Sequence, residues 1–73
     1  MSASNVVDAR GLSCPEPVLL TEQALREYGA ASFSVDVSSA AARDNVKNLL
    51  ESRGRAVRVE ATVGGWRVST GAG

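Results

Sequence analysis

A single cysteine and the absence of histidine constrain this fold more than any other feature of the sequence. One cysteine cannot form an internal disulfide, and without histidine a structural zinc site is not available either. The chain has 73 residues, and a chain of this length buries only about 60% of the surface that its unfolded form exposes. Stability must therefore come from one compact core, and we expect a single domain over residues 1–73 with flexible ends at 1–4 and 71–73.

The charged residues balance, with 8 Lys and Arg against 8 Asp and Glu. Domains that bind nucleic acid usually carry a basic excess, so we expect no direct contact with nucleic acid. The first five residues contain neither a basic cluster nor an apolar run, which argues against a secretory signal. No apolar stretch approaches the roughly 20 residues of a membrane helix, and a lone thiol suits a reducing compartment. We predict a cytoplasmic protein that does not bind membranes.

Helical spacing of apolar residues predicts a first helix from about Pro15 to Tyr28. Proline suits the first turn because its missing N–H would have no partner there, and Gly29 is a suitable C-terminal stop. The expected buried face consists of Val18, Thr21, Ala24, Leu25 and Tyr28.

The same spacing predicts a second helix from about Ser39 to Arg53. Ser38 or Ser39 serves as its N-cap, and Gly54 ends it. The expected buried face consists of Ala42, Val46, Leu49 and Leu50, and the expected exposed face of Arg43, Asp44, Lys47 and Glu51.

Alternation of apolar and polar residues predicts four strands. The first covers Asn5 to Ala9, with Val7 and Ala9 pointing inward. The pair at 64–65, Gly-Gly, indicates a two-residue hairpin between the last two strands. The expected apolar positions of the other strands are Phe33, Val35 and Val37; Val57, Val59, Ala61 and Val63; and Trp66, Val68 and Thr70.

The predicted order of elements is β-α-β-α-β-β. Clean alternation in the last three strands indicates that one face of the sheet is buried and the other is solvated. Two helices are enough to cover one face of a sheet. We therefore expect an α+β two-layer sandwich with four strands, two helices on one face and an open sheet surface on the other.

The stretch from Asp8 to Pro17 joins the first strand to the first helix, and it holds the only cysteine and both prolines. A loop after a strand in a β-α unit is a common location for functional sites. Cys14 falls at the expected N-cap, where the partial positive charge of the helix start lowers the pKa of a thiol. Arg10 adds a positive charge and Glu16 a negative one, so we expect modest activation of the thiol.

Two interpretations of Cys14 are open. A lone cysteine is often a small buried hydrophobe, whereas a place in a Gly/Pro loop at a helix start favours a nucleophile. Pro15 and Pro17 each fix φ at about −65°, which indicates a rigid platform that presents the sulfur outward. Without histidine there is no Cys-His pair for acyl transfer, and without a second cysteine there is no CxxC redox cycle. One unassisted thiolate is still able to exchange with another sulfur.

The loop resembles the TusA/SirA-like family of small sulfur-transfer proteins in the pattern D-x-R-G-L-x-C-P-x-P-V. The matching residues are Asp8, Arg10, Gly11, Leu12, Cys14, Pro15, Pro17 and Val18, continued by Thr21, Ala24 and Leu25. The element order fits as well, so the resemblance extends from about Asn5 to Thr70. It implies a mixed four-stranded sheet with the final hairpin packed into it.

The resemblance implies a persulfide mechanism in which Cys14 is the catalytic residue. A cysteine desulfurase or another sulfur carrier is the implied donor, and a thiol protein is the implied acceptor. Neither a cofactor nor a metal is implied. The expected supporting residues of the loop and helix start are Asp8, Arg10, Gly11, Pro15, Glu16 and Pro17.

Two departures from the family pattern concern the pathway. Relatives that feed tRNA thiolation often carry an Asp-Pro pair after the second strand, whereas residues 41–46 here read Ala-Ala-Arg-Asp-Asn-Val and resemble the subgroup associated with selenium metabolism. The pair Glu22-Gln23 stands where relatives frequently place basic residues. Members of that subgroup often have a second domain downstream. The alternative hypothesis is a non-catalytic protein-interaction or regulatory module. The resemblance to this subgroup adds a narrower version of it, in which the chain is the N-terminal domain of a longer selenium-metabolism protein.

Other residues have both a binding and a structural interpretation. Trp66 is either a partner-docking aromatic or, as we favour, a core side chain. Arg10 binds an anion or is a solvated charge, and Asp8 orients the loop by accepting backbone N–H bonds. RNA binding, a third hypothesis, is disfavoured by the neutral charge. A basic cluster able to dock an acidic partner, or else a merely solvated face, would consist of Arg53, Arg55, Arg58 and Arg67.

Overall fold

The computed structural model describes residues 5–13, 15–29 and 31–71. The elements follow in the predicted order β-α-β-α-β-β, and the predicted fold class is confirmed. Their bounds are β1 (Val6–Asp8), α1 (Glu16–Tyr28), β2 (Phe33–Val37), α2 (Ala40–Ser52), β3 (Val57–Thr62) and β4 (Gly65–Thr70). Of the ends predicted to be flexible, 1–4 and 71–73, all residues except Gly71 lie outside the described residues.

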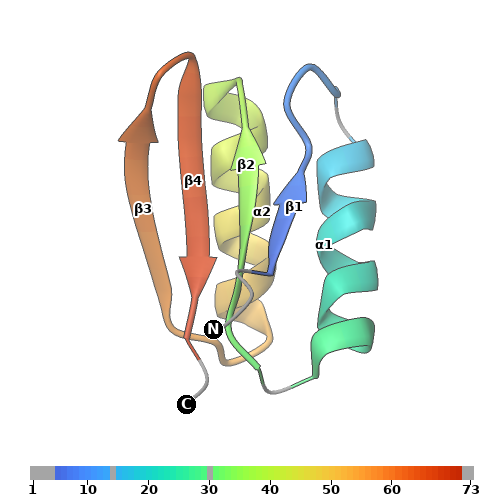
Figure 1. The fold of residues 1–73 in the computed structure, drawn as a ribbon. Helices are drawn as coiled ribbons and strands as arrows, with labels where there is room; N and C mark the ends of the chain where they lie inside the picture. Colours follow the sequence, from blue (N-terminus) through green and yellow to red (C-terminus); the bar gives the residue numbers. More distant parts are fainter. Residues whose placement is uncertain (1–4, 14, 30, 72–73) are drawn as a thin grey trace.

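The four strands form one mixed sheet in the order β1-β2-β4-β3. The β1–β2 pair is parallel, and the other two pairs are antiparallel. The final hairpin therefore packs into the sheet through β4, while β1 and β3 form its two edges (Figure 1). Both helices pack on one face, with α1 beside α2. This arrangement places the loop between β1 and α1 at the upper end of the molecule in Figure 1.

A row of valines from all four strands lines the core on the side of the sheet. Val7 pairs with Val35 across β1 and β2, and Val68 stands between Val35 and Val59. The neighbouring α2 residues complete the core, and each fully buried Val or Leu contributes about 1.5–3 kcal/mol relative to an exposed one. The fully or nearly fully buried apolar residues are Ala9, Ala24, Phe33, Val35, Val37, Ala42, Val46, Leu50 and Val68.

The second helix begins and ends where the sequence predicted. The Ser39 side chain accepts a hydrogen bond from the Ala42 backbone N–H at 3.1 Å, which satisfies one of the free donors of the first turn. The chain leaves the helix through Gly54, whose φ of 76° lies in the left-handed region. The first helix ends at Gly29 in the same way, with φ 61°.

The hairpin between β3 and β4 differs from the prediction. Thr62 pairs with Gly65, so the two turn residues are Val63 and Gly64 rather than the predicted Gly64 and Gly65. Val63 is fully exposed and not an inward residue of β3. Gly65 is needed inside β4, because a side chain there would collide with the backbone carbonyl of Val37. Only Gly64, with φ 85°, takes the positive φ of the turn.

Candidate functional site at the β1–α1 loop

Asp8 and Arg10 fix the beginning of the loop. The Arg10 guanidinium donates hydrogen bonds of 2.9 and 3.2 Å to the Asp8 carboxylate, and the Arg10 backbone N–H donates a third at 3.2 Å. These hydrogen bonds hold the pKa of Asp8 below its ordinary value, although both side chains are exposed. The Arg10 charge is therefore paired with Asp8 within the loop, and it remains exposed to solvent, as the interpretation of a solvated loop charge expected.

Gly11 joins the loop to the junction between β2 and α2. Its φ of 78° requires glycine, and its backbone N–H donates a hydrogen bond of 2.8 Å to the Ser38 hydroxyl. Two residues earlier, the Ala9 N–H donates to the Asp36 carbonyl at 2.9 Å, which extends the β1–β2 pairing. The sequence did not reveal this role of Ser38, because a bond between residues 27 positions apart leaves no local pattern.

The first helix starts one residue later than predicted. Pro15, not Cys14, occupies the N-cap position, because the Pro15 carbonyl accepts the first helical hydrogen bond from the Leu19 N–H at 3.0 Å. Proline has no N–H and no side-chain acceptor, so α1 lacks the side-chain cap that α2 has. Cys14 itself lies outside the described residues. Its two sequence neighbours, Ser13 and Pro15, are exposed.

Glu16 and Pro17 form the first turn of α1. The Glu16 backbone N–H donates to the Ser13 carbonyl at 3.0 Å, and the Glu16 side chain is exposed. Pro17 is buried against the core, and its carbonyl accepts a bond of 2.8 Å from the Thr21 hydroxyl. One proline thus lies at the surface and the other anchors the helix start.

An apolar hollow lies beside this helix start. It has a volume of about 420 Å³ and is lined by Leu12, Glu16, Leu19 and Leu20. Leu19 is 55% exposed, so its apolar side chain is available for contact with another molecule. Leu19 was not among the residues predicted from the sequence. The helical spacing could have indicated it, because Leu19 falls beside the predicted buried face of α1, where an apolar side chain is left exposed.

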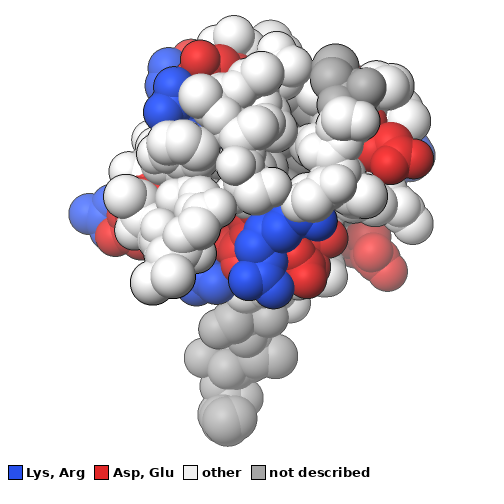
Figure 2. Space-filling model, turned by 90° about the horizontal axis from the view of Figure 1, so that it is seen from above, with Lys and Arg blue, Asp and Glu red and all other residues white. Residues whose placement is uncertain are grey.

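A second ion pair lies on the open face of the sheet. The Arg67 guanidinium donates hydrogen bonds of 2.7 and 3.0 Å to the Asp36 carboxylate, whose side chain is only 14% exposed. These bonds lower the pKa of Asp36, and partial burial opposes this shift without reversing it. Seen from the end that carries the loop, blue and red side chains lie side by side on the molecule (Figure 2).

The hypothesis of a basic cluster around the last strands is not supported by the contacts. Arg53 pairs with Glu22 at 3.2 Å, and Arg67 pairs with Asp36. Arg55 donates to the backbone carbonyls of residues 29 and 31, at 2.9 and 3.1 Å. Three of the four arginines therefore serve the fold, and only Arg58 extends from the outer strand without such a contact among the described residues.

Trp66 takes the structural role that the sequence favoured. Its side chain is half-buried and packs against the core. The Arg43 guanidinium lies over the ring, 4.7 Å from the ring centroid. A cation over an aromatic ring at this distance is attracted by the ring's electron density.

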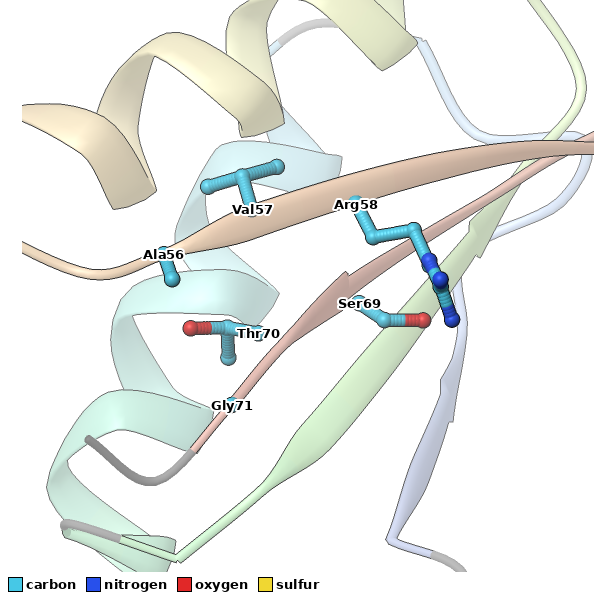
Figure 3. Close-up of a pocket in the computed structure, with 6 residues that line it drawn as sticks. All are labelled: Ala56, Val57, Arg58, Ser69, Thr70 and Gly71. Carbon is cyan, nitrogen blue, oxygen red and sulfur yellow. The ribbon is translucent and has the colours of Figure 1, made fainter.

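A second hollow lies at the opposite end of the molecule from the loop. It has a volume of about 340 Å³, and Figure 3 shows its lining by the beginning of β3 and the end of β4. Its distance from the loop keeps it out of the candidate site. Within the part of the chain that the structure describes, no helix is long and apolar enough to cross a membrane, and no three acidic, His or Cys side chains gather as a metal site.

Comparison with known proteins identifies the class. A model of the family described as Sulfurtransferase TusA matches residues 5–69, which is most of the chain. The crystal structure of a SirA-like protein from Desulfitobacterium hafniense superposes with a TM-score of 0.82 at 31% sequence identity, over 93% of this chain and 96% of that chain. No curated protein sequence is a significant match. This chain belongs to the TusA sulfurtransferase family.

Proposed function

We propose that Cys14 accepts a sulfane sulfur as a persulfide and passes it to the thiol of an acceptor protein. The observation that carries this proposal is the family match over residues 5–69, which includes the only cysteine of the chain. Further support comes from the exposure of Ser13 and Pro15 on either side of the cysteine. A sulfur carrier requires that its thiol be reachable by two partners in turn.

The proposed transfer needs only sulfur exchange. The Cys14 thiolate attacks the terminal sulfur of a donor persulfide, so that the donor S–S bond breaks as a new S–S bond forms on Cys14. The donor leaves as a thiolate, and the transferred sulfur keeps its proton. In the second step an acceptor thiolate attacks the terminal sulfur on Cys14 and releases the Cys14 thiolate. No external oxidant or reductant is consumed in either step.

A protein donor is favoured by the hollow beside the helix start. Leu12, Leu19 and Leu20 offer apolar contact area, and Glu16 at the rim offers a negative charge. The proposed donor is a cysteine desulfurase or another sulfur carrier, whose persulfide segment docks with apolar side chains in this hollow. We place the protein in the cytoplasm, because a lone thiol stays reduced there.

The first experiment loads the purified protein with a cysteine desulfurase and cysteine, and records its intact mass before and after reduction. The expected result is a gain of one sulfur atom that is lost on reduction and is absent in Cys14→Ser. The fold of this variant is checked by circular dichroism. A folded protein that gains no sulfur from either the desulfurase or polysulfide would contradict the proposal and favour the non-catalytic interaction module.

A second experiment distinguishes the reactivity of the Cys14 thiol from the docking of the donor protein. Leu19→Ser should slow loading by the desulfurase while leaving loading by polysulfide unchanged, because polysulfide needs no docking. Val6→Ala is the matched control, since Val6 is also an exposed apolar residue but lies on β1 away from the hollow. Equal loading of both variants by the desulfurase would show that the hollow is not the docking surface.

A further inference from the structure

The two edges of the sheet differ in length and in what they offer to another chain. The β1 edge is only three residues long, and short edges resist pairing. The β3 edge is six residues long, contains no proline, and has no strand partner on its outer side among the described residues. An uncovered edge of this length presents a row of backbone donors and acceptors.

The side chains of β3 alternate in a pattern that suits a second copy of the same strand. Arg58 and Glu60 project on the open face, opposite Ser69 and Arg67 of β4. Val57 and Val59 project on the helix face, where they remain half-buried. Figure 3 shows that Val57 and Arg58 point to opposite sides of the strand. The helix layer therefore leaves apolar area on β3 that a neighbour is able to cover.

We propose that β3 pairs antiparallel with β3 of a second copy around a twofold axis at Val59. In this register Val59 faces Val59 of the second copy, and Val57 faces Ala61. On the open face each Arg58 faces the Glu60 of the other copy, which gives two ion pairs per dimer. Residues directly opposite in an antiparallel pair lie about 4.5–5.5 Å apart at Cβ, close enough for both kinds of contact.

The charges of Arg58 and Glu60 favour this register over the registers shifted to either side. Opposite residues must project on the same face, so the register shifts in steps of two. A shift in one direction places the two Glu60 side chains opposite each other, and a shift in the other direction places the two Arg58 side chains opposite each other. Like charges directly opposite are destabilising. An edge strand whose charges all had one sign would repel a second copy in every register. The β3 edge, with one charge of each sign, permits one register without such repulsion.

The proposed dimer leaves the candidate sulfur site free. The β1–α1 loop lies on the edge of the molecule opposite to β3 (Figure 1). Each dimer would therefore present two β1–α1 loops on its outer sides. Dimerisation is thus tested independently of sulfur loading on Cys14. An interface made from one strand edge is at the small end of specific interfaces, so we expect reversible association.

Analytical ultracentrifugation across a concentration series, with the full 73-residue chain at low salt, tests the proposal. The wild type should shift from monomer to dimer with increasing concentration. Arg58→Glu alone and Glu60→Arg alone should remain monomeric, because each places like charges opposite each other. An equimolar mixture of these two variants should form a heterodimer, since the carboxylates of one variant then face the guanidinium groups of the other.

The controls separate pairing at the β3 edge from a general effect of net charge. Arg26→Glu changes the net charge as Arg58→Glu does, but on an exposed position of α1, and it should still dimerise. Circular dichroism checks that each variant is folded. A wild type that stays monomeric at about 1 mM, a concentration at which a dimer with a Kd of about 1 mM would be detected, overturns the proposal. Dimerisation that survives in both single variants overturns it as well.

Discussion

The two junctions at which a strand leads into a helix show how one small domain separates stability from chemistry. Between β2 and α2 only Ser38 and Ser39 intervene, and the Ser39 side chain caps the helix. Between β1 and α1 the connection is seven residues long, and Pro15 precedes the helix as its N-cap residue without a side-chain cap. Each junction follows a strand that carries an aspartate paired with an arginine.

The difference lies in what each helix buries. The second helix places Val46 and Leu50 completely inside the core. The first helix buries smaller residues near its start, Pro17 and Thr21, and leaves Leu19 at the surface. The short, capped junction thus leads into the helix that fills the core, whereas the long junction places Arg10, Gly11, Ser13 and Pro15 at the surface. We expect mutations at the first junction to affect transfer and mutations at the second to affect stability.

The largest expected effect comes from truncating the core under α2. Leu50→Ala should lower the free energy of unfolding by about 2–5 kcal/mol, because it leaves a cavity among fully buried side chains. Leu19→Ala, the same substitution on α1, should change it by less than about 0.5 kcal/mol, because this side chain is largely exposed. Urea unfolding followed by circular dichroism measures both, and similar losses in the two variants would contradict the comparison.

The next largest effect on stability is expected from substitutions at the N-terminal ends of the two helices. Ser39→Ala should cost about 1 kcal/mol of stability, since the Ala42 N–H loses its partner. Ser13→Ala, before a helix start that has no side-chain cap, should cost almost nothing. The same urea experiment compares them. A larger loss in Ser13→Ala would mean that the start of α1 is also held by a serine.

The two aspartates should respond differently to acid. Because its hydrogen bonds with Arg67 lower the folded-state pKa of Asp36, the pair stabilises the protein above the unfolded-state pKa of about 3.9. This stability is lost as the pH falls through the lower folded-state pKa. Asp36→Asn should therefore cost about 0.5–1 kcal/mol at neutral pH and flatten the acid part of the stability curve.

Asp8→Asn is the matched comparison for Asp36→Asn. The pKa of Asp8 is lowered by Arg10 in the same direction, but both side chains of this pair are more than half exposed. Solvent screens such a pair, so this variant should follow the wild type. Urea midpoints between about pH 3 and pH 7, a range chosen around the ordinary carboxylate pKa, provide the test. Parallel curves for wild type and Asp36→Asn would refute the role of the Asp36–Arg67 pair.

The smallest effect concerns the hydrogen bond that links the two junctions. Ser38→Ala removes the acceptor of the Gly11 N–H at an exposed position, so stability should change by less than about 0.5 kcal/mol. The exchange of the Gly11 amide with solvent should nevertheless become faster. Hydrogen exchange followed by NMR measures this amide directly, with Ser69→Ala as the control on the open sheet face. An unchanged exchange rate at Gly11 would show that the two junctions are held separately.

The sequence by itself determined the elements whose signals are local. A serine cap at Ser38 or Ser39, the stop at Gly54 and the alternation along residues 33–37 each act over a few residues. The structure confirms them and selects Ser39 as the cap. The loop that carries Cys14 was also recognisable, because its glycine, prolines and cysteine lie within one short stretch. Short-range sterics and hydrogen bonding decide such features, so they can be read along the chain.

Only the tertiary structure decided the features that depend on distant neighbours. The hairpin turn moved to Val63 and Gly64 because Gly65 must lie against the Val37 carbonyl. The pairing of Asp36 with Arg67 follows from the strand order, and so does the uncovered edge of β3. The physical reason is the same in each case. These contacts join residues that are far apart in the chain, and only the folding of the whole core brings their atoms within reach of each other.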